Sequence, residues 1–272
     1  MDNKTVVVLG GEVGGSSVAN DLRCRLGRKH DVLLVDKMGR HVFWPSLFWI
    51  QVGLREPKAI TKDIGRLLRR GIDVVRGEVS CTDAATTCAK VDGKKIGADY
   101  LVVSLGADLA PGNVPGLDEA GHNLYSPEGS ISKMALRRPT IFLAYILPMF
   151  CPRLSVRPAR RGRRLEAVDR ESMETRFPGV FAIGDNTSIP LEMGLPLPKT
   201  GVVAYHQAQA VARTIAARIN GEGRDGTFDG HRVCFVEAGG GRAGFGGGDF
   251  YGRPLPQVKF HEPSRKWHMV KV

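Results

Sequence analysis

The sequence predicts an α/β fold built on a parallel sheet, and the sheet draws its strands from two distant stretches of the chain. Near the N-terminus, the apolar run at residues 5–9 is followed at once by glycines and then by a helical pattern. Far along the chain, a second apolar run at residues 180–183 ends in Gly184 and Asp185. Apolar runs without polar alternation are typical of strands covered on both faces, as strands in parallel sheets are.

The N-terminal stretch has the pattern of a dinucleotide-binding turn. Gly10, Gly14 and Gly15 follow the first expected strand, a helix is expected next, and a second strand at residues 32–35 ends in Asp36. Glycines permit a tight turn, the helix N-terminus attracts a diphosphate, and the acidic residue binds ribose hydroxyls. These four residues are therefore predicted to bind a cofactor.

Glu12 occupies the second glycine position of this pattern. A Cβ there obstructs the approach of the backbone to the diphosphate, and a carboxylate repels it. Two interpretations are open: either the side chain turns outward and the ligand still binds, or the site is impaired.

Two further motifs complete a recognisable set. The stretch TRFPGVFAIGD at residues 175–185 directs the carboxylate of Asp185 from a strand end, and DYLVVSLGA at residues 99–107 is a further strand that reaches Gly106. In order, the three motifs resemble those of the two-dinucleotide-domain flavoproteins, which include pyridine nucleotide-disulfide reductases, type II NADH dehydrogenases and sulfide:quinone oxidoreductases. The resemblance implies a Rossmann-like FAD-binding domain, with Gly106, Gly184 and Asp185 at the FAD.

Two local stretches narrow the resemblance. DKMGRHVFWPSL at residues 36–47 resembles the stretch along the flavin in sulfide:quinone oxidoreductases and flavocytochrome c sulfide dehydrogenases, which implies Lys37 and Pro45 at the cofactor. PKTG at residues 198–201 begins an amphipathic helix that Gly221 is expected to end. In this family such a helix points its N-terminus at the flavin, which implies that Lys199 stabilises the charge of the reduced ring.

The five cysteines indicate which kind of chemistry to expect. They form no CxxC pair and no metal-ligand spacing, so no metal site is expected. Cys151 in LPMFCP and Cys234 in HRVCFVEAGG lie in segments that resemble the redox-cysteine segments of the sulfide oxidisers. The resemblance implies these two as catalytic residues, with sulfide as substrate and a quinone as acceptor. A buried inert thiol is the alternative for each, and Cys24, Cys81 and Cys88 are interpreted as structural.

Residues 106–175 are too few for the second dinucleotide-binding domain that the family inserts there. The predicted organisation is a first part of the FAD-binding domain at 1–136, a truncated basic connector at 137–164, a second part of the FAD-binding domain at 165–225 and a truncated C-terminal segment at 226–272. The apolar burst at 141–150 and the arginines after it indicate an internal deletion or a frame disturbance.

Three local expectations complete the fold. Residues 57–70 place Ile60, Ile64, Leu67 and Leu68 on one stripe of a surface helix. Residues 72–79 and 90–96 alternate like a small antiparallel meander. The glycine-rich stretch at 238–248 is expected to be a flexible loop.

Composition and net charge narrow the partners that the chain is expected to have. A net charge of +11 suits an anionic membrane surface or nucleic acid, but the arginine cluster at 153–164 lacks stacking aromatics, so no nucleic-acid partner is predicted. No apolar span reaches about 18 residues. We expect a cytoplasmic FAD-dependent oxidoreductase of the sulfide:quinone type, peripheral on the inner face of the cell membrane. The alternatives are a type II NADH:quinone dehydrogenase-like flavoprotein and an inactive FAD-binding remnant.

Overall fold

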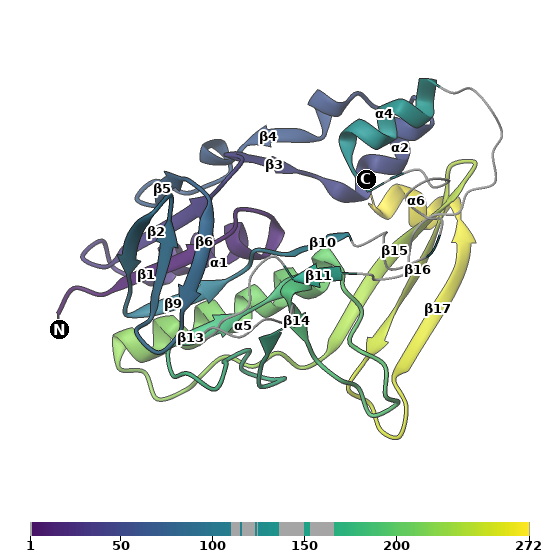
Figure 1. The fold of residues 1–272 in the computed structure, drawn as a ribbon. Coiled ribbons are helices and arrows are strands. Elements are labelled where there is room, and N and C mark those ends of the chain that lie inside the picture. Colours follow the sequence, from purple (N-terminus) through teal and green to yellow (C-terminus); the bar gives the residue numbers. More distant parts are fainter. Residues whose placement is uncertain are drawn as a thin grey trace.

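The structure is organised around a five-stranded sheet (Figure 1). The computed structural model describes residues 2–109, 115, 123, 125–135, 150–152 and 166–271. Every neighbouring pair of strands in this sheet is parallel. In spatial order the strands are β13 (Val180–Ala182), β9 (Tyr100–Val103), β1 (Thr5–Leu9), β2 (Asp31–Asp36) and β5 (Asp73–Arg76). The predicted α/β fold is confirmed.

The sheet is covered on both faces, which explains its apolar strands. Alternate residues of β1 show the two faces: Val6 and Val8 pack toward the helices α1 (Val13–Arg25) and α5 (Gly201–Asn220). Val7 and Leu9 pack toward an antiparallel meander of β6 (Val79–Asp83), β7 (Cys88–Val91) and β8 (Lys94–Gly97). All four side chains are fully buried, and each contributes about 1.5–3 kcal/mol by leaving water.

Strand β13 enters the sheet from far along the chain. It pairs with β9 in the register Val180↔Leu101, so residues almost 80 positions apart lie side by side. This pairing is the reason that one sheet can draw its strands from two distant stretches of the chain. Among the described residues no second parallel sheet of more than two strands occurs.

Helix α5 has the ends that the sequence predicts. Thr200 caps its N-terminus, where the side-chain oxygen accepts a hydrogen bond from the amide of Val203 at 3.3 Å. Gly221 ends it in the left-handed conformation, at φ 75°. The helix lies alongside α1 on one face of the sheet (Figure 1).

Shorter elements surround this body. Within the described residues there are three small two-stranded pairs: β3 (Arg40–Val42) with β4 (Thr61–Asp63), β10 (Ala107–Leu109) with β11 (Phe150–Pro152), and β12 (Glu166–Ala167) with β14 (Thr187–Ser188). Short helices are η1 (Trp44–Ser46), α2 (Leu47–Gln51), η2 (Pro57–Ala59), η3 (Ile64–Arg66), α4 (Pro127–Ala135) and η5 (Gly184–Asn186). Helix α4 packs against α2.

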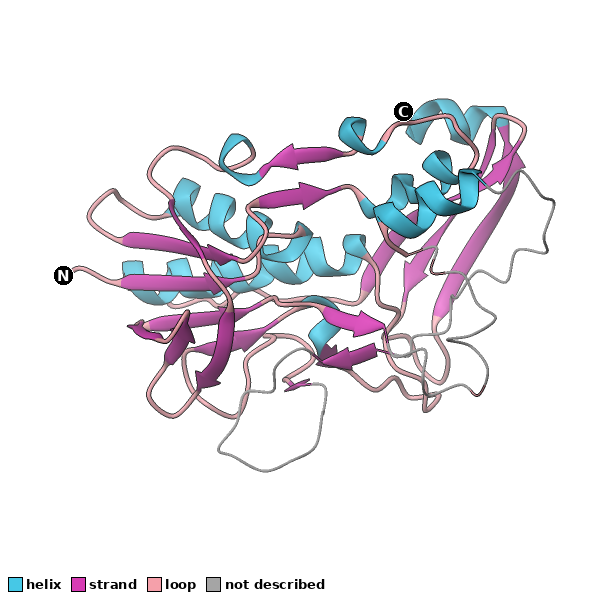
Figure 2. Ribbon diagram, turned by 45° about the horizontal axis from the view of Figure 1, so that its top comes forward, coloured by secondary structure: helices cyan, strands magenta, loops and turns pink. Residues whose placement is uncertain are grey.

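A separate antiparallel sheet lies at the end of the molecule opposite the N-terminus (Figures 1 and 2). It consists of β15 (His231–Gly239), β16 (Arg242–Asp249) and β17 (Gln257–Ser264), followed by helix α6 (Arg265–Lys271). Trp267 of α6 stacks on Phe245 of β16, with ring centroids 4.7 Å apart. Within the described part of the chain, every helix is too short or too polar to cross a bilayer.

The prediction of a surface helix at residues 57–70 is wrong. The segment is divided into η2, β4 and η3, and β4 pairs with β3 in the register Val42↔Thr61. Ile60 and Ile64 are buried on either side of β4, but in two different clusters: Ile60 packs with Val42, Leu47 and Ile50, and Ile64 packs in the main core. A distant partner strand has overridden the local helical spacing.

Two other local expectations need correction. The first half of the expected meander, residues 73–76, is β5 of the parallel sheet, and the meander itself begins at Val79. The glycine-rich stretch is the hairpin of β15 and β16 rather than a flexible loop. Gly246 of β16 serves packing, because a Cβ on it would lie 2.7 Å from the ring of Phe260. Gly239, Gly240 and Gly241 at the turn have open space at their Cβ positions.

Candidate functional site

The carboxyl ends of three neighbouring strands meet at one edge of the parallel sheet. Gly10 follows β1, Ser104 follows β9 and Ile183 follows β13. Backbone hydrogen bonds continue the sheet into these turns: the amide of Ser104 donates to Leu9 at 2.8 Å and that of Ile183 donates to Val103 at 3.0 Å. In open α/β sheets this edge is where ligands bind.

The three predicted glycines pack tightly at this edge. Gly10 has a φ of +97°, and a Cβ on it would overlap the carbonyl of Ser104. A Cβ on Gly15 would overlap the carbonyl of Gly10, and one on Gly14 would lie 2.6 Å from Oγ of Ser104. The glycines therefore let the N-terminus of α1 approach the strands closely, which is one of the functions of glycine in a dinucleotide-binding turn.

Asp36 fastens the same turn to the end of β2. Its Oδ2 accepts a hydrogen bond from the amide of Gly11 at 2.9 Å, and its Oδ1 accepts from the amides of Met38 and Gly39 at 2.9 and 2.6 Å. A carboxylate has about four acceptor positions, so the group can still accept from a ribose hydroxyl.

Three further residues that were assigned to the cofactor, Lys37, Pro45 and Gly106, lie nearer the surface. The ammonium of Lys37 is 2.7 Å from Glu78 in an exposed ion pair. Pro45 is exposed within η1. Gly106 has a φ of +71°, and no atom lies within 4 Å of the position that its Cβ would take.

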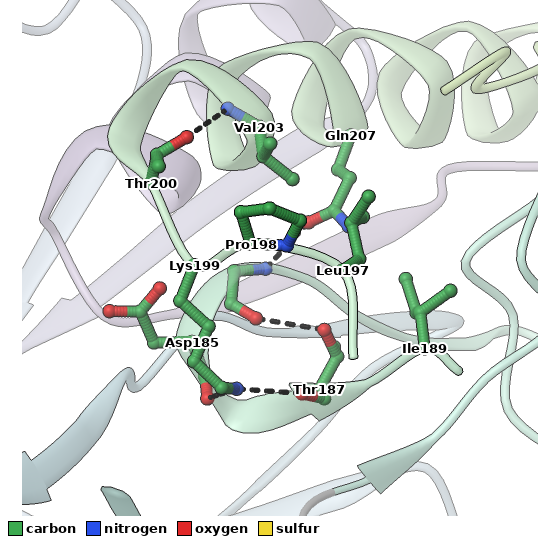
Figure 3. Close-up of a pocket in the computed structure, with 10 residues that line it drawn as sticks. Asp185, Thr187, Ile189, Leu197, Pro198, Lys199, Thr200, Val203 and Gln207 are labelled. Carbon is green, nitrogen blue, oxygen red and sulfur yellow. Dashed lines mark hydrogen bonds between the residues drawn. The ribbon is translucent and has the colours of Figure 1, made fainter. Parts of the chain in front are cut away.

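Asp185 and Lys199 lie together at the turn after β13 (Figure 3). Nζ of Lys199 donates hydrogen bonds to the backbone carbonyls of Asp185, at 2.5 Å, and Thr187, at 2.8 Å. Burial raises the pKa of the Asp185 carboxyl, and the ammonium of Lys199 opposes this shift. Burial likewise lowers the pKa of Lys199, and Asp185 opposes that shift. The two charges thus stabilise each other inside the protein.

Gln207 is a site residue that the sequence reasoning missed. This glutamine of α5 is 1% exposed, and its Oε1 accepts a hydrogen bond from the amide of Gly184 at 2.8 Å (Figure 3). Gly184 has a φ of +75°, so the bond holds a left-handed turn directly before Asp185. The sequence held a signal for this residue: Gln207 is polar, yet it lies on the same helix face as the apolar residues Ala204, Ala208 and Val211.

The hollow at this turn is small. Its enclosed volume is about 10 Å³, which is roughly the room that one water molecule needs. The residues that line it, among them Asp185, Lys199 and Gln207, therefore pack closely around it.

Glu12 lies at the N-cap of α1 with an unstrained, extended backbone, at φ −74° and ψ −168°. Its Oε2 is 3.3 Å from Nδ1 of His41 on β3. Burial lowers the pKa of His41, against the opposing effects of a hydrogen bond with the Gly11 backbone and the charge of Asp36. His41 belongs to the stretch at residues 36–47 that resembles the flavin segment, but the sequence did not indicate its contact with Glu12, because the two residues are far apart in the chain.

An aromatic pair lies close to the same acids. Tyr125, just before α4, stacks on Trp44 with ring centroids 5.4 Å apart. Burial raises the pKa of the Tyr125 phenol, and the negative charges of Asp185 and Glu12 raise it further. The phenol therefore lies within electrostatic reach of both turns of the sheet edge.

The two cysteines assigned as catalytic are on different elements. Cys234 is exposed on β15, where its Cα is in register with Gly246 of β16. The backbone of Cys151 is in β11, which lies beside η5, but its side chain lies outside the described residues. The described cysteines Cys24 and Cys81 are exposed free thiols, and Cys88 is a buried one.

Comparison with known proteins gives three matches of note. The sequence pattern of the family described as Pyridine nucleotide-disulphide oxidoreductase matches residues 4–136. Mitochondrial sulfide:quinone oxidoreductase of Dictyostelium discoideum is 32% identical over 115 residues, which are 42% of this chain and 25% of that protein. The external alternative NAD(P)H-ubiquinone oxidoreductase B2 of Arabidopsis thaliana is 27% identical over 138 residues, which are 46% of this chain and 23% of that protein. The matches thus span about a quarter of each curated relative.

Among solved structures, the sulfide:quinone oxidoreductase of Aquifex aeolicus superposes with a TM-score of 0.78 and 17% identity. The superposition covers 98% of this chain and 89% of that chain. At this identity the likeness establishes a common fold.

Proposed function

We propose, from the premise that residues 4–136 belong to the pyridine nucleotide-disulphide oxidoreductase family, that this chain is an FAD-dependent oxidoreductase of the sulfide:quinone type. The observation that carries the proposal is the meeting of two turns at one sheet edge. The glycine turn after β1 faces a helix N-terminus, and the turn after β13 holds Asp185 beside the capped N-terminus of α5. Two helix N-termini and two carboxylates suit a ligand that carries both phosphates and hydroxyl groups.

The residues present fit FAD, with one exception. Asp36 would accept from the ribose hydroxyls, the amides at the start of α1 would bind the diphosphate, and Asp185 would accept from a ribityl hydroxyl. Lys199 would place a positive charge near the flavin end of the cofactor. Glu12 is the exception, because it sets a carboxylate where the diphosphate is expected. Its side chain lies against His41, which supports the interpretation that it turns aside.

Bound FAD would accept two electrons from a sulfur donor and pass them to a quinone. The chain itself would bind sulfide and break a sulfur–sulfur bond. We propose that hydrosulfide attacks a disulfide between Cys151 and Cys234: one cysteine sulfur forms the new S–S bond of a persulfide, and the other leaves as a thiolate. The exposure of Cys234 supports access by a small anion.

The domain organisation belongs to the same proposal. The FAD-binding domain would comprise residues 1–136 and 165–225, and 226–272 would form the C-terminal segment; residues 137–164 would be the basic connector. We further propose a cytoplasmic protein that associates peripherally with the membrane that holds its quinone, without nucleic-acid partners.

Anaerobic reduction distinguishes the proposal from its alternatives. Purified protein loaded with FAD is mixed with sulfide and, separately, with NADH, and the loss of the oxidised-flavin absorbance is followed. Sulfide is expected to bleach the flavin, and oxidised quinone is expected to restore the absorbance. Bleaching by NADH alone would reject the sulfide assignment and support the NADH-dehydrogenase alternative, which the Arabidopsis relative favours. Tight FAD binding without reduction by either donor would support an inactive remnant.

A further inference from the structure

Glu12 places a carboxylate at the N-terminus of α1, where the diphosphate of a dinucleotide would bind. Asp, Asn, Ser and Thr commonly cap a helix with their side chains, but Glu12 makes no side-chain hydrogen bond to the amides of α1. Its carboxylate instead lies against the imidazole of His41, with 3.3 Å between Oε2 and Nδ1. The side chain therefore contacts β3 and does not cap α1.

His41 is held firmly in this position. It is the central residue of β3, where it pairs with Lys62 of β4, and its side chain is 15% exposed. A hydrogen bond with the backbone of Gly11 ties the imidazole to the glycine turn itself. Because both contacts involve the turn, a change of charge on His41 acts directly at the place where a diphosphate would lie.

Among the described residues, several carboxylates lie in the region of the pair. The negative charge of Asp36, on β2, raises the pKa of His41. The charges of Glu12 and Asp185 both raise the pKa of Tyr125, which lies just before α4. Lys199, just before the N-cap of α5, donates to the backbone carbonyls of Asp185 and Thr187 in the turn after β13. Lys62 of β4 is the cross-strand neighbour of His41. A diphosphate at this edge would meet carboxylates from three elements, so the addition of one positive charge has a large effect on its binding.

We propose that Glu12 and His41 couple the binding of a dinucleotide diphosphate to the uptake of one proton. The imidazole takes the proton from solvent, and the imidazolium forms an ion pair with the carboxylate of Glu12. The pair then has no net charge, and the repulsion that Glu12 alone exerts on the diphosphate is removed. Glu12 and His41 are thus the residues that determine how this site accepts a diphosphate without the usual glycine. The inference rests on the proposed function, since it takes FAD as the ligand of this turn.

The direction of the pH dependence follows from the state of the free protein. Burial lowers the pKa of His41, so its imidazole is neutral at neutral pH before the ligand binds. Bound diphosphate favours the imidazolium and raises this pKa. Affinity for FAD is therefore highest below the pKa of His41 in the free protein, and it falls as the pH rises through the pKa in the complex.

The test measures the dissociation constant of FAD by fluorescence from about pH 5.5 to about pH 8.5, on either side of the ordinary histidine pKa. For the natural protein the constant is expected to rise by up to about tenfold per pH unit, as the uptake of one proton requires. Calorimetry in two buffers of different ionisation enthalpy is expected to show net proton uptake on FAD binding in the pH range over which the affinity falls.

Three variants separate charge from shape. E12Q keeps the size of the side chain and E12G restores the glycine; both are expected to tighten binding at high pH by at least about tenfold, because the carboxylate is removed. H41Q is expected to bind FAD as weakly at low pH as the natural protein does at high pH. H231Q, which removes an exposed histidine of β15, is the matched control and is expected to keep the natural profile.

A pH-independent affinity of the natural protein, or an E12Q variant that binds FAD no more tightly than the natural protein at high pH, would overturn the coupling while FAD binding itself stands. If neither the natural protein nor E12G takes up FAD, the proposed function fails instead. Should H41Q fail to fold, E12Q still decides the question, because it leaves His41 in place.

Discussion

Replacing Gln207 by leucine tests whether this buried amide holds the turn before Asp185. The substitution keeps most of the volume but removes the oxygen that accepts from the amide of Gly184 at 2.8 Å. Gln207 is 1% exposed, so water cannot readily replace the lost acceptor. Leaving a buried amide unpaired costs about 1–3 kcal/mol of unfolding free energy. At about 2–4 °C per kcal/mol for a chain of this size, the midpoint of thermal unfolding should fall by roughly 2–12 °C.

Thermal unfolding followed by circular dichroism measures this change, and FAD titration measures its effect on the site. Q207L is expected to weaken FAD binding as well as stability, because Asp185 follows the freed amide directly. Gln209→Leu is the matched control on the same helix, since its amide donates to the exposed hydroxyl of Tyr205 at 3.2 Å. It should change the unfolding free energy by no more than about 0.5 kcal/mol. Equal midpoints for Q207L and the natural protein would refute the reasoning.

Three further predictions concern packing, charge and pH. Gly15→Ala should destabilise the protein by about 3 kcal/mol or more in denaturant unfolding, because its Cβ would overlap backbone, whereas Gly27→Ala, with no atom within 4 Å, should have little effect. Lys199→Met should lower the unfolding free energy by about 1.5–3 kcal/mol through loss of its bonds to two carbonyls, and an FAD titration should show weaker binding. Burial raises the pKa of Glu174, but hydrogen bonds from Arg218 and the Gly179 amide outweigh it and hold the pKa below its usual range. This contribution to stability is present above the ordinary glutamate pKa and is lost as the pH falls through the folded-state value, so Arg218→Met should reduce the acid sensitivity of unfolding measured over that range.

The local sequence was sufficient for the parts of the fold whose patterns are strong. The apolar runs before Gly10 and Gly184 predicted β1 and β13, and the long stripe ending at Gly221 predicted α5. Such patterns are informative because a strand that is buried on two faces requires a continuous run of apolar residues, and a helix that is buried on one face requires apolar residues at helical spacing. The same patterns placed Asp36 and Asp185 at strand ends, and in the structure both lie at the carboxyl edge of the sheet.

Other features could be known only from the tertiary structure, because they depend on contacts with residues that are distant in the chain. Residues 61–63 have helical spacing, yet pairing with β3 makes them a strand. Gly246 belongs to a glycine-rich stretch, yet a neighbouring strand and the ring of Phe260 make it part of a sheet. The contact of Glu12 with His41 arises in the same way, because β3 brings the imidazole to a turn almost 30 residues earlier. Local composition determines which conformations a segment favours, but the free energy of pairing and burial with remote segments selects among them, and no local pattern records that choice.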